Sequence, residues 1–328
     1  MPSAPQIKAY IEFEDNRLLP LLFGEHDHNI RQVEQALEVH ITARGNQVVI
    51  TGEIIQVEAA QEALKHLYER LKSGLHISTS EVDTAVRLAL NPLHGPLHDS
   101  PAPHRLHDFA ISTRRGLITP HSKGQADYIE KLRHHNLVFA VGPAGTGKTY
   151  IAAAFGVAML LAGKVDRIIL SRPAVEAGEK LGFLPGDLRE KVDPYLRPLY
   201  DALYDMLPQD QVVNRLAKGE IEVAPLAYMR GRTLSHAYII LDEAQNTSIA
   251  QMKMVLTRLG EGSYMVVTGD LTQLDLPPGQ ISGLMDALRV LETVTGIGFA
   301  FLQDTDIIRH PLVRQIVNAY ANSEPSKR

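Results

Sequence analysis

Apolar and polar positions alternate at the start of the chain and then change period. Residues 7–13 carry an apolar side chain at every second position, which predicts a strand, and residues 30–37 repeat apolar side chains at helical spacing. Segments 40–43 and 47–51 flank a tight turn and predict a hairpin, and 57–71 predicts an amphipathic helix. The predicted order is β-α-β-β-α, a small α/β domain.

Three apolar runs later in the chain predict buried strands: Leu137–Val141, Ala237–Leu241 and Tyr264–Thr268. The most apolar stretch, Ile151–Ala162, follows the first of these runs and predicts a buried helix. It is too short to span a bilayer, so we expect no membrane insertion. Strands that alternate with helices predict a parallel sheet flanked by helices.

A glycine-rich loop connects the first of these strands to its helix in the pattern G-x-x-x-x-G-K-T. Such a loop points backbone amides at phosphate groups, while its lysine reaches the β and γ phosphates and its threonine binds Mg²⁺. We therefore predict that ATP and Mg²⁺ are bound here. The nucleotide-binding residues predicted from the loop are Gly142, Pro143, Ala144, Gly145, Thr146, Gly147, Lys148, Thr149 and Tyr150.

Polar residues follow the other two buried strands. Asp242 and Glu243 come directly after Leu241, and Gln273 lies shortly after the third strand. Because the carboxyl ends of parallel strands face the nucleotide in such sheets, we expect Asp242 to hold Mg²⁺ and Glu243 to deprotonate the attacking water. Gln273 is expected near the γ-phosphate, where it would report whether that phosphate is present. Lys148, Glu243 and Gln273 are the predicted catalytic residues.

Gln125 lies upstream of the glycine-rich loop. Its amide could pair with the amino group and ring nitrogen of adenine, which would select ATP. The alternative is an ordinary surface glutamine.

Composition narrows the protein class. The sequence has no cysteine, which excludes disulfides, thiolate metal sites and thiol catalysis. The first residues lack a secretory signal, so we expect a cytoplasmic protein. Residues 1–90 hold 8 Lys and Arg against 13 Asp and Glu, so the first domain is acidic, which counts against strong RNA binding by that domain alone.

The chain divides into four predicted parts. Residues 1–90 form the small α/β domain, 91–120 a linker rich in Pro and His, 121–320 the nucleotide-binding domain, and 321–328 a disordered tail. The linker histidines have no second ligand cluster at zinc-like spacing, so we assign them no metal.

Four segments together resemble the PhoH-like family of ATPases: GPAGTGKT (142–149), SRPAVEAGEKLGFLPGD (171–187), GRTLSHAYIILDEAQN (231–246) and VVTGDLTQLDLP (266–277). The resemblance covers roughly 120–320, and its motifs are similar to those of superfamily-one helicases. It implies a RecA-like P-loop NTPase fold. It also implies an ATP-dependent role with RNA, in rRNA maturation or in RNA turnover beside an endoribonuclease.

The segment Gly24–Ile30 resembles the loop that opens an RNA-binding helix in KH domains, and a subgroup of the PhoH-like family carries such a domain. Asp27 stands where the KH pattern has its second glycine, which puts the clamping of a phosphate in doubt. The alternative is a small α/β domain used for packing or protein contacts.

By position, Ser171-Arg172-Pro173 corresponds to the helicase segment that touches single-stranded nucleic acid, so Arg172 is the candidate RNA contact. The alternative is that Arg172 pairs with a carboxylate and supports the fold. The glycine-rich segment Glu176–Asp187 is predicted to be a surface loop that could also meet RNA.

Too few residues follow Glu243 for the second lobe that supplies an arginine to ATP in superfamily-one helicases. We therefore expect a neighbouring subunit to supply it, in a homo-oligomer that forms a ring. The candidate arginines are Arg230, Arg232 and Arg309, each of which could instead be structural.

The motifs leave three functions open. The first is an RNA-stimulated ATPase, with RNA helicase activity as an extension. The second is a binding module whose ATP state controls capture of an endoribonuclease or ribosomal partner without unwinding. The third, a small-molecule kinase, is disfavoured because Glu243 is placed for water rather than for an acceptor.

Overall fold

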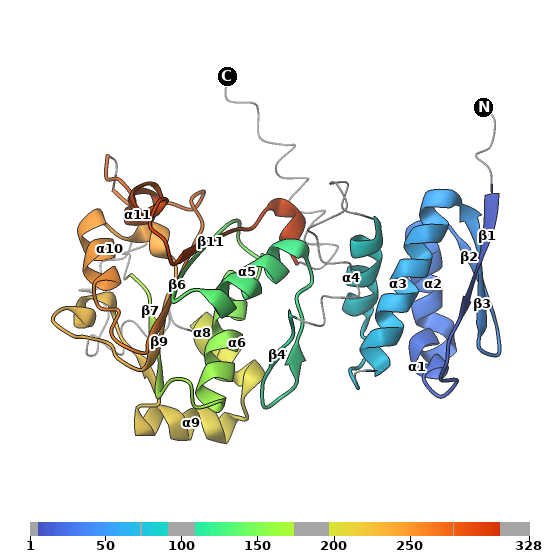
Figure 1. Cartoon of the computed structure of the whole chain (residues 1–328), viewed down its shortest axis with the longest axis horizontal. Helices are drawn as coiled ribbons and strands as arrows, with labels where there is room; N and C mark the ends of the chain where they lie inside the picture. The colour runs from blue at the N-terminus through green and yellow to red at the C-terminus, as the bar shows by residue number, and fades with distance from the viewer. Residues whose placement is uncertain (1–5, 73, 91–108, 174–196, 278, 309–328) are drawn as a thin grey trace. The chain divides into compact units, whose positions relative to one another are not determined.

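The computed structural model describes residues 6–72, 74–90, 109–173, 197–277 and 279–308. They form two compact units, each with its own elements (Figure 1). Of the described residues, the N-terminal unit comprises 6–72, 74–90, 109–110 and 119–122, and the C-terminal unit comprises 111–118 and those from 123 on.

The N-terminal unit is a three-stranded antiparallel sheet with helices packed against it. The sheet order is β1-β3-β2, and Ile11, Val48 and Ile50 point from it into the core. The elements are β1 (Gln6–Glu12), α1 (Leu19–Phe23), α2 (His28–Leu37), β2 (His40–Arg44), β3 (Gln47–Glu53), α3 (Ile54–Lys72) and α4 (Thr79–Leu90).

The predicted strand, helix, hairpin and helix of this unit are confirmed, but the structure adds two helices. Helix α1 has five residues, too few to establish a helical period, and it separates β1 from the segment that begins at Gly24. Helix α4 follows α3 and packs against it. His26 and Asp27 both have positive φ, a conformation that glycine adopts more easily. The likeness to a KH domain stays a prediction.

The C-terminal unit is built on a six-stranded sheet in which every pair of neighbouring strands is parallel. The order is β11-β6-β10-β9-β7-β8. The strands are β6 (Leu137–Val141), β7 (Arg167–Ser171), β8 (Ile221–Val223), β9 (Ala237–Leu241), β10 (Tyr264–Gly269) and β11 (Ile297–Phe301). The three predicted strands are thus confirmed.

Helices cover both faces of this sheet. Figure 1 shows α5 and α6 on one side and α10 and α11 on the other. The helix predicted over Ile151–Ala162 is confirmed as part of α6, which lies against β7, β9 and β10. The helices are α5 (Lys123–His134), α6 (Lys148–Leu161), α8 (Arg197–Met206), α9 (Gln209–Lys218), α10 (Ile249–Leu256) and α11 (Gly283–Leu291). The fold is a P-loop NTPase fold, as the sequence predicts.

Helix α6 packs closely on β9 because it carries a glycine where the two meet. A Cβ atom on Gly156 would lie 2.6 Å from the ring of Tyr238. Tyr238 is buried, and its hydroxyl has no hydrogen-bond partner among the described residues. The tyrosine therefore contributes packing rather than a polar contact.

The first prediction concerns this hydroxyl. Tyr238→Phe removes a buried polar group that lacks a partner, so we expect the free energy of unfolding to stay equal or rise by up to about 1 kcal/mol. Tyr128→Phe is the matched control, because the buried Tyr128 hydroxyl donates to the Lys148 carbonyl at 3.3 Å. Denaturant unfolding should show a loss for the control alone, and a clear loss for Tyr238→Phe would contradict this assignment.

Several predicted features lie wholly or partly outside the described residues. They are most of the linker, the loop Glu176–Asp187, the tail 321–328 and Arg309. The described end of the linker contains a small hairpin of β4 (Ile111–Ser112) and β5 (Leu117–Ile118), which is too short to show a period. No helix among the described residues has the length and apolar character required to cross a membrane.

Candidate functional site

The loop between β6 and α6 encloses the side chain of its own lysine. Gly145 and Gly147 have φ of 85° and 80°, a conformation that favours glycine, and they fold the loop over the start of α6. The Lys148 Nζ donates to the carbonyls of Gly142 and Pro143 at 2.6 and 2.7 Å. Burial lowers the pKa of Lys148, and the nearby carboxylates of Asp270, Asp242 and Glu243 act in the opposite direction.

Helix α5 contacts this loop through Gln125. Gln125 is 2% exposed, and its Nε2 donates to the Thr146 carbonyl at 3.0 Å. Gln125 is therefore no surface glutamine, which excludes the alternative raised from the sequence. Its contact with adenine stays a prediction, and its contact with the loop is one that the sequence did not indicate.

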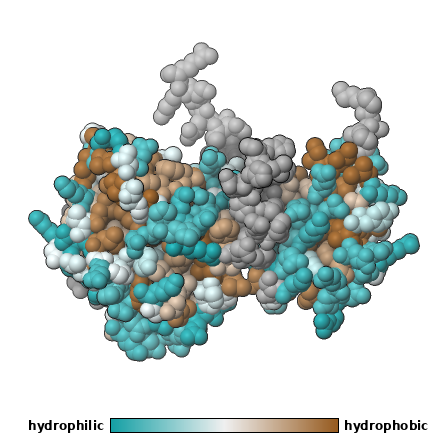
Figure 2. Space-filling model, in the orientation of Figure 1, coloured by the Kyte–Doolittle hydropathy of each residue, from teal (hydrophilic) through white to brown (hydrophobic). Residues whose placement is uncertain are grey.

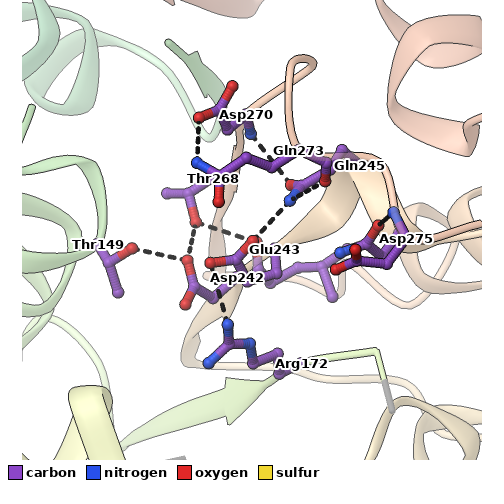
Figure 3. A network of polar contacts seen from close by, with 11 residues as sticks. Thr149, Arg172, Asp242, Glu243, Gln245, Thr268, Asp270, Gln273 and Asp275 are labelled. Atoms are coloured by element: carbon purple, nitrogen blue, oxygen red, sulfur yellow. Dashed lines mark hydrogen bonds and ion pairs between the residues drawn. The ribbon is translucent and has the colours of Figure 1, made fainter. Parts of the chain in front are cut away.

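Asp242 follows β9 and lies opposite the start of α6. Its Oδ1 accepts hydrogen bonds from the Thr149 hydroxyl at 2.7 Å and from the Thr268 hydroxyl at 2.6 Å (Figure 3). Hydroxyl and carboxylate oxygens are the ligands that Mg²⁺ prefers, and it is usually held by one or two carboxylates together with substrate phosphates. The oxygens of Thr149 and Asp242 therefore fit the predicted metal.

Glu243 has a φ of 53°, which a non-glycine residue rarely adopts. Both of its carboxylate oxygens are engaged. Oε1 forms an ion pair with the Arg172 Nη2 at 3.0 Å, and Oε2 accepts a hydrogen bond from the Gln245 Nε2 at 2.6 Å (Figure 3). Strained backbone of this kind concentrates at functional sites.

Gln245 is a residue that the sequence analysis did not single out. Its side chain is fully buried and connects the ends of two strands. The Nε2 also donates to the Gln273 carbonyl at 3.1 Å, and the Oε1 accepts from the Asp270 amide at 3.0 Å. A glutamine after two acidic residues gives no sequence signal of its own, because these partners are brought together only by the sheet.

The hydrogen bonds of Gln245 are expected to stabilise the fold. Gln245→Leu keeps a similar volume but leaves the buried Asp270 amide without its acceptor, so we expect the free energy of unfolding to fall by about 1–3 kcal/mol. Gln280 is exposed, its backbone N–H donates to the Pro277 carbonyl, and its side chain has no hydrogen bond among the described residues, so Gln280→Leu is a control with little expected change. Equal midpoints for both variants in denaturant unfolding would contradict the bridging role.

The loop after β10 is held by Asp270. Burial by itself would raise the pKa of Asp270, but hydrogen bonds from Thr272 and Gln273 and the charge of Lys148 hold that pKa below its usual value. The Gln273 Nε2 donates to the Asp270 Oδ2 at 2.6 Å. This contact fixes the direction of the Gln273 amide.

A pocket of about 480 Å³ is lined by residues of the phosphate-binding loop, the acidic pair, Asp270 and Gln273. The pocket brings together the loop, the acidic pair and Gln273, as the sequence predicts, and it adds Arg172. Helix α8 supplies a further wall that the sequence did not reveal, because exposed aspartates on an amphipathic helix look like an ordinary solvated face. The pocket-lining residues of α8 are Pro198, Asp201, Ala202 and Asp205.

The candidate arginines differ in their contacts. Arg232 forms hydrogen bonds with both carboxylate oxygens of Glu222, at 2.6 and 2.8 Å, which hold the pKa of Arg232 above its usual value. Arg230 is exposed, and no contact of its side chain is seen in the part of the chain that the structure describes. Of these two, Arg230 has the guanidinium that is available to a neighbouring molecule.

The chain is similar in sequence to known proteins of one family. The sequence profile of the PhoH-like protein family matches residues 117–321. A PhoH-like protein of Mycobacterium tuberculosis (strain ATCC 25618 / H37Rv) is 49% identical over 320 residues, which cover 97% of this chain and 89% of that protein. One from Bacillus subtilis (strain 168) is 46% identical over 302 residues, covering 91% and 92%. The crystal structure of Pif1 helicase from Candida albicans has 14% identity and a TM-score of 0.33, covering 61% of this chain and 43% of Pif1.

Proposed function

Because this chain belongs to the PhoH-like protein family, and because its P-loop and acidic pair line one pocket, we propose that it hydrolyses ATP with Mg²⁺ and that RNA stimulates the reaction. The observation that carries the proposal is the convergence of Lys148, Asp242 and Glu243. A phosphate-binding cation, a metal-binding carboxylate and a candidate base are the three groups that this reaction requires.

In the proposed reaction, the oxygen of a water forms a bond to the γ-phosphorus. The bond from the γ-phosphorus to the bridging oxygen breaks, and its electron pair stays with ADP. Glu243 accepts the proton of the water, and Lys148 neutralises charge on the β and γ phosphates. Thr149 and Asp242 would hold Mg²⁺, which when bound supplies positive charge to the phosphate oxygens.

The proposed RNA contact is Arg172, which follows the carboxyl end of β7 and lines the pocket. A guanidinium binds a phosphate through two parallel hydrogen bonds, and 23% of this side chain is exposed. Arg172 also forms an ion pair with a carboxylate, that of Glu243, and one side chain can serve both roles in turn. Phosphate release by the purified protein in Mg²⁺ and ATP, with and without single-stranded RNA, tests the proposal. We expect RNA to raise turnover, and equal rates would count against an RNA role.

A second candidate function is a nucleotide-controlled binding module that captures an endoribonuclease or ribosomal partner. It is supported by the position of Gln273, which lines the pocket while its neighbours Thr272 and Leu274 are exposed. A change at the γ-phosphate could therefore alter an exposed surface. Partner capture that depends on ATP, without strand separation, would favour this function over a helicase.

We further propose that the active form is a homo-oligomeric ring in which a neighbouring subunit supplies Arg230. Its exposed side chain supports this role. Figure 2 shows hydrophobic surface over α11, in agreement with the exposure of Met285 and Val290, and such surfaces favour association. Arg230→Ala should lower turnover without changing ATP affinity, and an unchanged turnover would remove this assignment.

A further inference from the structure

Each carboxylate oxygen of Glu243 already has a donor as its partner, although Glu243 is proposed to accept a proton from water. A general base needs a lone pair within hydrogen-bond reach of the water whose proton it removes. Here Oε1 already faces the Arg172 guanidinium at 3.0 Å, and Oε2 already accepts from Gln245 at 2.6 Å. In this arrangement the Arg172 guanidinium occupies the side of Oε1 from which a water could otherwise donate.

The two contacts differ in how easily they can be released. Gln245 is fully buried, and two further hydrogen bonds tie its amide to the loop after β10. The side chains of Arg172 and Glu243 are 23% and 34% exposed. An anion from solution can therefore reach the Arg172 guanidinium, while the hydrogen bond from Gln245 to Oε2 stays in place.

The positions of Arg172 and Glu243 follow from the sheet. Ser171 pairs with Leu241 in the parallel register of β7 and β9, and the Asp242 amide donates to the Ser171 carbonyl at 2.9 Å. Each of the two side chains therefore extends from the carboxyl end of its strand into the same pocket. A movement of the Arg172 side chain alone, without any change in the sheet, suffices to free Oε1.

We propose that the Arg172–Glu243 ion pair is a brake on ATP hydrolysis and that a nucleic-acid phosphate releases it by binding Arg172. The proposal rests on the proposed function and names how RNA acts on that site. A nucleic-acid phosphate carries the same single negative charge as a carboxylate, and its two non-bridging oxygens match the guanidinium fork, so it competes with Glu243 for Arg172. The freed Glu243 then keeps its direction through Gln245 and accepts the proton of water.

The proposal predicts that loss of the arginine raises activity, which is opposite to the effect of losing a structural or phosphate-binding residue. In the absence of RNA, Arg172→Ala should raise ATP turnover about tenfold, as expected for removal of one charge-assisted hydrogen bond. Adding single-stranded polyuridine should then change the rate by less than about twofold. Arg172→Lys, which keeps the charge but loses the fork, should give an intermediate basal rate.

Phosphate release by the full chain, in Mg²⁺ and ATP, tests this directly. Lys131→Ala is the control, because Lys131 on α5 forms an ion pair with Asp127 at 3.0 Å and does not line the pocket. It should keep both the low basal rate and the stimulation by polyuridine. The double variant Arg172→Ala with Glu243→Gln should be inactive, which shows that the raised rate still uses Glu243.

Other results would overturn the brake. A lower basal rate in both Arg172→Ala and Arg172→Lys would show that Arg172 assists hydrolysis, and normal stimulation of Arg172→Ala would show that RNA acts elsewhere. Because Arg172→Lys retains a cation at this position, it tests the proposal even where Arg172→Ala does not fold. Either result leaves ATP hydrolysis by Glu243 intact, whereas full activity of Glu243→Gln alone would defeat the proposed function itself.

Discussion

Glu243→Gln is expected to lower ATP turnover by about 10²- to 10⁴-fold while leaving ATP affinity unchanged. The amide keeps the size of the side chain but cannot accept a proton from water. The phosphate-binding loop and Asp242 are untouched by the substitution, so the nucleotide should still bind. Phosphate release gives the turnover, and equilibrium binding of a fluorescent ATP analogue gives the affinity.

Glu222→Gln is the matched control for this prediction. Glu222 also pairs with an arginine, Arg232, at 2.6 Å, but it does not line the pocket. Its replacement should leave turnover near the wild-type value. If Glu243→Gln hydrolysed ATP as fast as this control, another group would have to be the base.

Lys148→Ala is expected to weaken ATP binding by at least about thirtyfold, equivalent to roughly 2 kcal/mol, because a partly enclosed charge is lost opposite the phosphates. In this structure the Lys148 ammonium is held by the carbonyls of Gly142 and Pro143. The same nitrogen therefore lies within the loop. Equilibrium binding of ATP measures the loss.

The exposed Lys253 on α10 provides the control Lys253→Ala, which should bind ATP normally. Thermal unfolding of both variants separates a binding defect from a folding defect. If folded Lys148→Ala retained ATP with wild-type affinity, the loop would not be the phosphate site.

The sequence predicted the centre of the fold well, for a physical reason. Strands of a parallel sheet are covered on both faces, so β6, β9 and β10 appear as continuous apolar runs bounded by polar residues. The residues that follow such runs, including Lys148, Asp242 and Glu243, must then lie at one edge of the sheet. The local apolar pattern is therefore sufficient to predict that these residues lie close together.

Other parts of the site depend on distant contacts that no local pattern records. From the sequence, Gln125 could be an exposed side chain, yet it is buried because α5 packs against the phosphate-binding loop. Gln245 acquires its role from strand order, since β9 and β10 are neighbours in space. The short helix α1 was missed because five residues do not complete two turns.

The central claim is that the loop around Lys148 and the carboxylates after β9 act on one nucleotide. A crystal structure of the Glu243→Gln variant with Mg²⁺ and ATP tests it most directly. The account predicts a triphosphate inside the loop, with Mg²⁺ bound by Thr149 and near Asp242 and the γ-phosphate between Lys148 and position 243. A nucleotide bound outside this pocket, or a γ-phosphate directed away from Asp242 and position 243, would contradict it.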